Sequence, residues 1–162
     1  MAEAFPGSRF WGFDIHPESI DAARGSAKKR GVEDRVTFEM ADAKNYPAEG
    51  FDLICFFDCL HDMGDPVGAA RHARGSLSQD GSVMLAEPYA NDRVEDNLNP
   101  IGRLYYSAST TLCCAHSIAE EGIALGAQAG EKRLAKVLKE AGFRSVRAAK
   151  KTAFNLILEA QS

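Results

Sequence analysis

Asp14 is the first side chain in the sequence whose type and position suggest chemistry. It ends a short apolar segment, residues 9–13, and a proline-initiated helix signal begins at Pro17. In α/β units that bind nucleotides, an acid at this place holds the ribose hydroxyls, and a glycine-rich turn precedes it by roughly 20 residues. Counting back that far from Asp14 passes the N-terminus. The sequence therefore presents the second half of a nucleotide site without its first half.

A second group of reactive side chains follows the apolar run 51–57. His61 is the best candidate for a general base, because histidine titrates near neutral pH and this one lies just beyond an expected strand. A histidine that only caps the loop or bonds a backbone carbonyl is the alternative, and the sequence leaves it open. Asp62 is a weak candidate for orienting His61, since adjacent side chains seldom face each other.

Cysteine usage predicts free thiols and no metal site. The sequence has four cysteines, Cys55, Cys59, Cys113 and Cys114. No secretion signal accompanies them, so reduced thiols are the default expectation. Their spacing with His61 and His116 fits no common zinc pattern.

Bulk properties exclude several classes of function. The chain has 162 residues, 45% of them hydrophobic, which is enough for one domain with a core. Its net charge is −4 and no long basic run occurs, so nucleic acid is a poor partner. No apolar stretch approaches the ~20 residues that span a bilayer. Without a signal pattern or a membrane segment, a cytoplasmic protein is expected.

The hydrophobic pattern alternates between strand and helix along most of the chain. Expected strands cover residues 9–13, 36–40, 51–57, 82–87, 145–150 and 153–160. Expected helices cover residues 17–30, 66–77, 101–114 and 131–141, and a capping box at Ser117 predicts a further short helix. Residues 79–81 are expected to form a turn.

This order predicts an α/β fold with a mostly parallel sheet, helices on both faces and an antiparallel strand pair at the C-terminus. In such sheets ligands bind at the carboxyl ends of the strands. That rule directs attention to Asp14, residues 41–44, residues 58–63 and Glu87.

These places carry motifs that resemble one family. The motifs are Phe13-Asp14-Ile15, Ala41-Asp42-Ala43, the strand 51–54 with its loop 58–63, and the strand 81–88. In this order and spacing they are similar to the class I S-adenosylmethionine-dependent methyltransferases, from the family's second strand to its end. The resemblance implies a Rossmann-like sheet and methyl transfer to an oxygen, nitrogen or carbon of a small molecule. The stretch 92–129 is typical of a bacterial subgroup with an N-terminal helical region.

The resemblance also implies which residues contact S-adenosylmethionine: Asp14, Ile15, Asp42, Ala43, Phe57 and Asp58. Asp14 would hold the ribose, Ile15 would pack on the adenine edge, and Asp42 would accept a hydrogen bond from the adenine amino group. Each has a plainer alternative. The aspartates can be helix caps or turn residues, and Ile15 and Phe57 can belong to the core.

The chain is interpreted as a single domain, residues 1–162, with a lid insertion at residues 89–128 that covers the acceptor pocket. Tyr105 and Tyr106 are candidates to stack on an aromatic acceptor, with core packing or a dimer contact as the alternative. Glu87 is a candidate to polarise the acceptor or to pair with Arg93 or Arg103.

One departure from the family is clear, because its first strand and glycine-rich loop are missing. The resemblance then implies that Met1 is an internal methionine or a chosen start, and that two strand edges are unpaired. Direct pairing of the strands 9–13 and 51–57, a swapped element or poor stability would follow, so a homo-oligomer is expected. An active and an inactive truncated enzyme both remain open. The rival hypotheses are a fragment of a nicotinamide-dependent oxidoreductase and a non-catalytic binding or dimerisation module.

Overall fold

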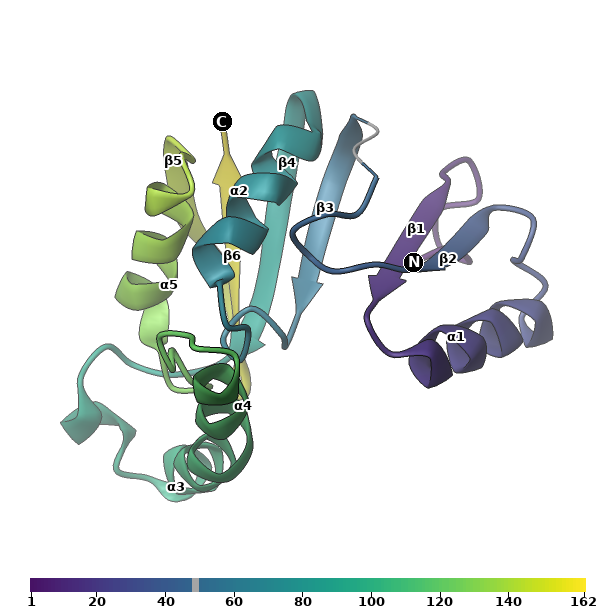
Figure 1. Cartoon of the computed structure of the whole chain (residues 1–162). Coiled ribbons are helices and arrows are strands. Elements are labelled where there is room, and N and C mark those ends of the chain that lie inside the picture. The colour runs from purple at the N-terminus through teal and green to yellow at the C-terminus, as the bar shows by residue number, and fades with distance from the viewer. Residues whose placement is uncertain (48–49) are drawn as a thin grey trace. The chain divides into compact units, whose positions relative to one another are not determined.

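The computed structural model describes residues 1–47 and 50–162 (Figure 1). The chain divides into two compact units, Met1–Pro47 and Ala48–Ser162, which we call unit 1 and unit 2 and describe separately. Within the described ranges, no helix has both the length and the apolar character needed to cross a membrane.

Unit 1 is a β-α-β element. Strand β1 (Phe10–Asp14) leads into helix α1 (Pro17–Lys29), and β2 (Val36–Met40) returns parallel to β1. Pro17 occupies the first turn of α1, where a missing N–H costs nothing. A Cβ atom at Gly12 of β1 would lie 2.6 Å from the ring of Phe38, so only glycine lets that ring pack across the strand. The strands and helix that the sequence predicted here are confirmed.

Unit 2 is a mixed sheet with strand order β3-β4-β6-β5. Its strands are β3 (Phe51–Phe57), β4 (Leu77–Pro88), β5 (Ser145–Lys151) and β6 (Asn155–Gln161). The β3 and β4 pair is parallel, whereas β6 runs antiparallel to both β4 and β5. The predicted α/β class and its antiparallel C-terminal strand pair are therefore confirmed.

One face of this sheet carries the core of unit 2. Val83 and Leu85 of β4 stand opposite Ala160 and Leu158 of β6, and all four are buried. Helices α2 (Pro66–Ser76) and α5 (Gly130–Glu140) both cover this face (Figure 1). Within unit 2, α2 and α5 therefore enclose the core against the sheet.

The opposite face of the sheet is only partly covered. Two side chains of β3, Leu53 and Phe57, are 43% and 56% exposed. In the described part of the chain, β3 pairs with β4 alone and β1 pairs with β2 alone. Within the described residues of unit 2, the other edge of β3 has no strand partner.

Strand β4 begins earlier than the sequence predicts. The expected turn at residues 79–81 lies inside it, and the register with β3 shifts between Phe51 and Leu53. A Cβ atom at Gly81 would lie 2.6 Å from the Phe51 carbonyl oxygen. The turn prediction was wrong because this glycine serves a close approach between strands rather than a reversal of the chain.

The insertion, residues 89–128, is mostly helical. It contains the 3₁₀ turn η1 (Val94–Asn97), helix α3 (Pro100–Ala108), the π-helical turn η2 (Ser109–Cys113) and helix α4 (Cys114–Ala119). The helix expected to start at Ser117 is not formed, because Ser117 lies within α4. Its hydroxyl instead donates to the Met63 carbonyl oxygen at 3.0 Å and accepts from the Ala124 N–H at 3.2 Å.

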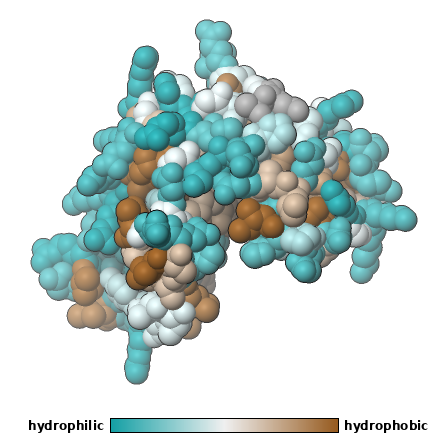
Figure 2. Space-filling view, in the orientation of Figure 1, coloured by the Kyte–Doolittle hydropathy of each residue, from teal (hydrophilic) through white to brown (hydrophobic). Residues whose placement is uncertain are grey.

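Hydrophobic side chains are exposed on the insertion, and brown atoms mark its surface at the lower left of Figure 2. The exposed large residues there are Val94, Leu98, Leu104, Leu112, Ile118 and Ile123. Exposed apolar side chains, where they gather into a patch, are typical of association sites.

We expect the isolated chain to associate with itself or to unfold at low temperature, because β3 presents a free edge and two exposed apolar side chains. Light scattering and thermal melting measure both properties. Leu53→Lys should reduce association, since an edge lysine opposes strand pairing, whereas Ala153→Lys on the exposed β5–β6 turn should not. A monodisperse wild-type monomer that melts cooperatively above ~60 °C would contradict this expectation.

Candidate active site

The candidate active site lies at the carboxyl ends of β3 and β4. These strands are parallel, so Phe57 and Glu87 reach the same end of the sheet. Asp58 continues the ladder, because its N–H donates to the Ala86 carbonyl oxygen at 2.8 Å. The chain then turns through residues 59–65 into α2, and this loop carries His61.

A buried His61–Glu87 pair forms the centre of the site. His61 is 3% exposed and Glu87 is 1% exposed. His61 Nδ1 contacts Glu87 Oε2, and Glu87 Oε1 accepts the Leu60 N–H at 3.0 Å. Both carboxylate oxygens of Glu87 therefore have a donor. The arrangement fixes the orientation of the imidazole ring, as a carboxylate does for a catalytic histidine.

The electrostatics of the pair reflect burial and mutual contact. Burial opposes a charged imidazolium, yet the hydrogen bond and negative charge of Glu87 outweigh it and raise the pKa of His61. Burial raises the pKa of the Glu87 carboxyl, and the contact with His61 only partly offsets that rise. Burial also raises the pKa of the nearby Asp62 carboxyl.

Asp58 adds an exposed carboxylate beside this pair. Its Oδ1 lies 3.9 Å from His61 Nδ1, and its side chain is 70% exposed. Its φ of 53° is left-handed, a conformation that aspartate tolerates better than most residues. Asp58, His61 and Glu87 bring one potential ligand atom each within 4.8 Å of one another, a spacing that a metal ion can bridge. Here the imidazole and the Glu87 carboxylate contact each other directly.

The insertion holds the loop that carries His61. The Gly126 N–H donates to the His61 carbonyl oxygen at 3.0 Å, and the Gly64 N–H donates to Glu120 Oε2 at 2.9 Å. Together with the bond from Ser117 to Met63, these contacts tie three residues of the loop to the insertion. The other ring nitrogen of His61, Nε2, lies 3.2 Å from the Cys113 Sγ atom of η2.

The residues predicted to bind the acceptor lie in different surroundings. Glu87 is turned to His61 inside the protein, and Arg93, one of its expected partners, pairs with Glu95 at 3.5 Å. The Tyr105 hydroxyl donates to the Phe154 carbonyl oxygen at 3.1 Å, which ties α3 to the β5–β6 turn. Tyr106 is half-buried on the same helix.

Four of the six predicted cofactor residues belong to unit 1, at the ends of its two strands. Asp14 Oδ1 accepts the His16 N–H at 2.8 Å, and Asp42 Oδ1 accepts the Lys44 N–H at 2.7 Å. Ile15 is 47% exposed and Ala43 is half-buried. The other two, Phe57 and Asp58, belong to unit 2.

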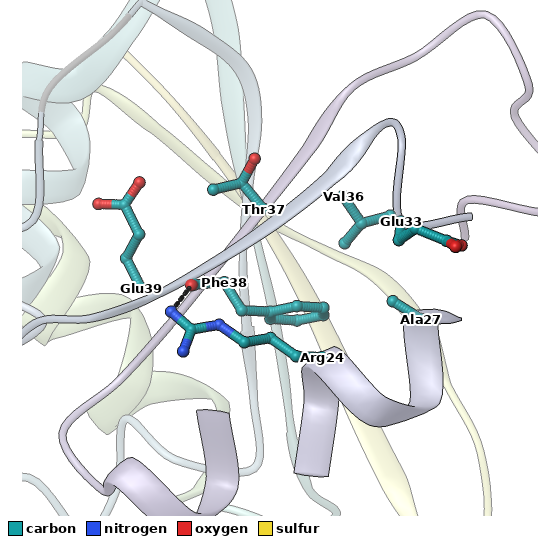
Figure 3. Close-up of a pocket in the computed structure, with 7 residues that line it drawn as sticks. All are labelled: Arg24, Ala27, Glu33, Val36, Thr37, Phe38 and Glu39. Carbon is teal, nitrogen blue, oxygen red and sulfur yellow. Dashed lines mark hydrogen bonds between the residues drawn. The ribbon is translucent and has the colours of Figure 1, made fainter. Parts of the chain in front are cut away.

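A cavity of about 380 Å³ lies elsewhere in unit 1, between α1 and β2 (Figure 3). The Arg24 guanidinium crosses it and donates to the Phe38 carbonyl oxygen at 2.7 Å. None of the predicted site residues lines it. The cavity is therefore separate from the strand ends at which the candidate residues lie.

Two contacts in the site were missed from the sequence. Glu87 was assigned to the acceptor, although its alternation with the buried Val83 and Leu85 indicated that it faces the core. Cys113 was treated only as a thiol, and no sequence signal placed it near His61, which is 52 residues away in the chain.

Comparison with known proteins identifies a family. The profile of a family described as methyltransferase domain matches residues 1–142. The 27-O-demethylrifamycin SV methyltransferase of Amycolatopsis mediterranei (strain S699) is 35% identical over 78 residues, 47% of this chain and 29% of that protein.

Two solved structures resemble the fold across 99% of the chain. An O-methyltransferase family protein from Burkholderia thailandensis gives a TM-score of 0.74 at 22% identity, over 46% of that chain. An O-methyltransferase from neocarzinostatin biosynthesis, in complex with S-adenosyl-L-homocysteine and 1,4-dihydroxy-2-naphthoic acid, gives 0.72 at 17% identity, over 44% of that chain. The chain spans less than half the length of these three relatives.

Replacing Glu87 by Gln should lower the pKa of His61, because the substitution removes the charge that favours the imidazolium. An NMR titration of the histidine ring protons measures this directly, with the other three histidines as internal references. Asp58→Asn is the matched control and should shift the His61 pKa less, since Asp58 is exposed and farther away. An unchanged His61 pKa in a folded Glu87→Gln variant would show that the pair is not the source of the shift.

Proposed function

Because the chain belongs to a family of methyltransferase domains, we propose that it transfers a methyl group from S-adenosylmethionine to a small-molecule acceptor. The observation that carries the proposal is the buried His61–Glu87 pair at the carboxyl ends of β3 and β4. A histidine held in this way is suited to remove a proton from an acceptor. The family match favours this function over an oxidoreductase.

A hydroxyl is the acceptor group that the site suits best. Hydroxyl oxygens are poor nucleophiles until they lose a proton, and His61 Nε2 provides the acceptor for that proton. The names of two relatives support this choice, since one refers to an O-demethylated rifamycin and the other to an enzyme in complex with a dihydroxynaphthoic acid. We propose a hydroxylated aromatic compound, with nitrogen and carbon acceptors as the alternatives.

The candidate residues fall into two groups, one that would bind the cofactor and one that would act on the acceptor. S-adenosylmethionine, when bound, supplies an electrophilic methyl group on a sulfonium sulfur. Asp14 would hold the ribose hydroxyls and Asp42 the adenine amino group, and Ile15, Ala43, Phe57 and Asp58 would line the cofactor. The exposed side chains of Ile15 and Phe57 fit this assignment better than a place in the core.

On the acceptor side, His61 takes the hydroxyl proton at Nε2 while Glu87 stabilises the imidazolium that forms. Much of the remaining acceleration comes from positioning, because the methyl group is already reactive. The insertion supplies the wall of the acceptor pocket, and Tyr106 is the tyrosine whose hydroxyl we assign to acceptor contact. Glu87 acts through His61 rather than on the acceptor itself.

We further propose that the working state is a homo-oligomer, supported by the exposed apolar surface of the insertion.

Calorimetric titration of S-adenosylmethionine tests the cofactor assignment. Asp14→Asn should weaken binding about 10-fold or more, because hydrogen bonds to a charged group are worth about 1.5–3 kcal/mol. Asp21→Asn, on the exposed face of α1, is the matched control and should bind like the wild type. Equal affinity for Asp14→Asn would remove Asp14 from the site, and no binding by the wild type would favour the non-catalytic alternative.

Activity measurements test the base. The wild-type chain should release S-adenosylhomocysteine in the presence of a panel of phenols, anilines and carbon acids, with the phenols preferred. His61→Ala should lower the rate about 10²- to 10⁴-fold while S-adenosylmethionine affinity is unchanged. His116→Ala is the control, since that histidine is exposed on the same insertion. A His61→Ala rate equal to the wild type would exclude His61 as the base.

A further inference from the structure

The contact between Cys113 and His61 is the feature that the proposed reaction does not use. The Sγ atom lies 3.2 Å from Nε2, the nitrogen that faces away from Glu87. Glu87 already occupies the other ring nitrogen. Every nitrogen of the candidate base therefore has a protein partner in this structure.

The direction of this hydrogen bond follows from the partners of His61. Glu87 uses both oxygens as acceptors, from Leu60 N–H and from the imidazole, so Nδ1 carries a proton. In neutral histidine the other nitrogen is then an acceptor. Burial, and next the charge of Asp62, raise the pKa of the Cys113 thiol, so the sulfur keeps its proton. In the neutral form of His61, which is the form that can act as a base, Cys113 thus donates S–H to Nε2.

The π-helical turn gives this thiol its place. A π turn brings side chains five residues apart onto one face, and Oγ of Ser109, the first residue of η2, lies 3.6 Å from Sγ of Cys114, the first residue of α4. Ser109 Oγ also accepts the Ala127 N–H at 2.9 Å, which anchors the start of the turn. Cys114 is thereby directed at Ser109 and the Ala124 carbonyl oxygen, and the preceding residue, Cys113, is directed at the base. Such π turns occur frequently at functional sites.

We propose that Cys113 is a positioning residue that holds the base nitrogen of His61 in the resting protein, in the place that the acceptor hydroxyl must take. This inference rests on the proposed function for its catalytic meaning. A thiol is a weak donor, so an acceptor O–H can displace it at small cost. The exchange keeps Nε2 hydrogen-bonded throughout and preserves the tautomer that can accept a proton. Acceptors consequently bind against η2, and the residue at position 113 affects which acceptors fit.

NMR of ¹⁵N-histidine-labelled protein tests the contact without any acceptor or cofactor. Cys113→Ala should move the His61 Nε2 resonance toward that of an imidazole nitrogen without a donor, and Cys113→Ser should restore much of the shift. Cys114→Ala is the matched control, because its thiol points away from His61. A His61 Nε2 resonance that is the same in Cys113→Ala and wild type would overturn the proposal.

Kinetics then tests the displacement with the best phenol of the panel. Cys113→Ala should lower KM for the phenol about 2- to 10-fold with kcat little changed, since one weak hydrogen bond no longer competes. Cys114→Ala should leave both constants unchanged. An unchanged or higher KM in Cys113→Ala would overturn the competition between thiol and acceptor. A wild-type chain with no methyl transfer would instead reject the proposed function, while the NMR comparison would still decide whether Cys113 holds the base nitrogen.

Discussion

The buried pair of His61 and Glu87 is the constraint on which the rest of unit 2 depends. A carboxylate removed from water costs roughly several kcal/mol unless donors replace the lost hydration. Glu87 obtains two donors, the Leu60 N–H and the imidazole, and both come from one loop. The pairing of β3 with β4 must therefore deliver that loop beside Glu87. Phe57 stands opposite Ala86, so Glu87 is the next residue along β4. A slip of one residue would turn its carboxylate to the other face of the sheet.

The insertion is the second part of unit 2 that positions the loop carrying His61. Its backbone and side chains bond His61, Met63 and Gly64, so the insertion fixes this loop. Two glycines allow this close approach. A Cβ atom at Gly122 would lie 2.5 Å from the Gly64 carbonyl oxygen, and one at Gly64 would lie 2.6 Å from Glu120 Cβ. The insertion thus holds the loop that carries His61, independently of the acceptor-covering role proposed for it.

The sequence predicted the elements of this site better than its contacts. Apolar runs and their capping residues located β3, α2, α5 and the last two strands, because burial and local backbone chemistry decide those elements. His61 was predicted as the base from its residue type and its position after a strand, and its burial against Glu87 is compatible with that role. Glu87, which contacts His61, was instead predicted to contact the acceptor. The sequence did not indicate the His61–Glu87 pair, because that pair depends on which face of β4 is covered. The contact with Cys113 depends on a π turn, which changes the directions in which the side chains of the helix point. Such a turn has no recognisable pattern in the sequence. Ser117 matched a helix start, but tertiary bonds to Met63 and Ala124 use its hydroxyl.

In unit 1, the structural role of Asp14 and Asp42 is compatible with the cofactor-binding role proposed for them. Asp14 holds the His16 N–H at the start of α1, and Asp42 holds the Lys44 N–H in the following loop. Each bond uses one carboxylate oxygen, and a carboxylate has two. The bond to the backbone fixes the side-chain rotamer, which reduces the ordering cost when the second oxygen accepts a ligand hydroxyl or amino group. A carboxylate that bonds the backbone two residues on, at the end of a parallel strand, therefore keeps one oxygen for a ligand, so the local role of these residues does not conflict with the binding role that we propose for them.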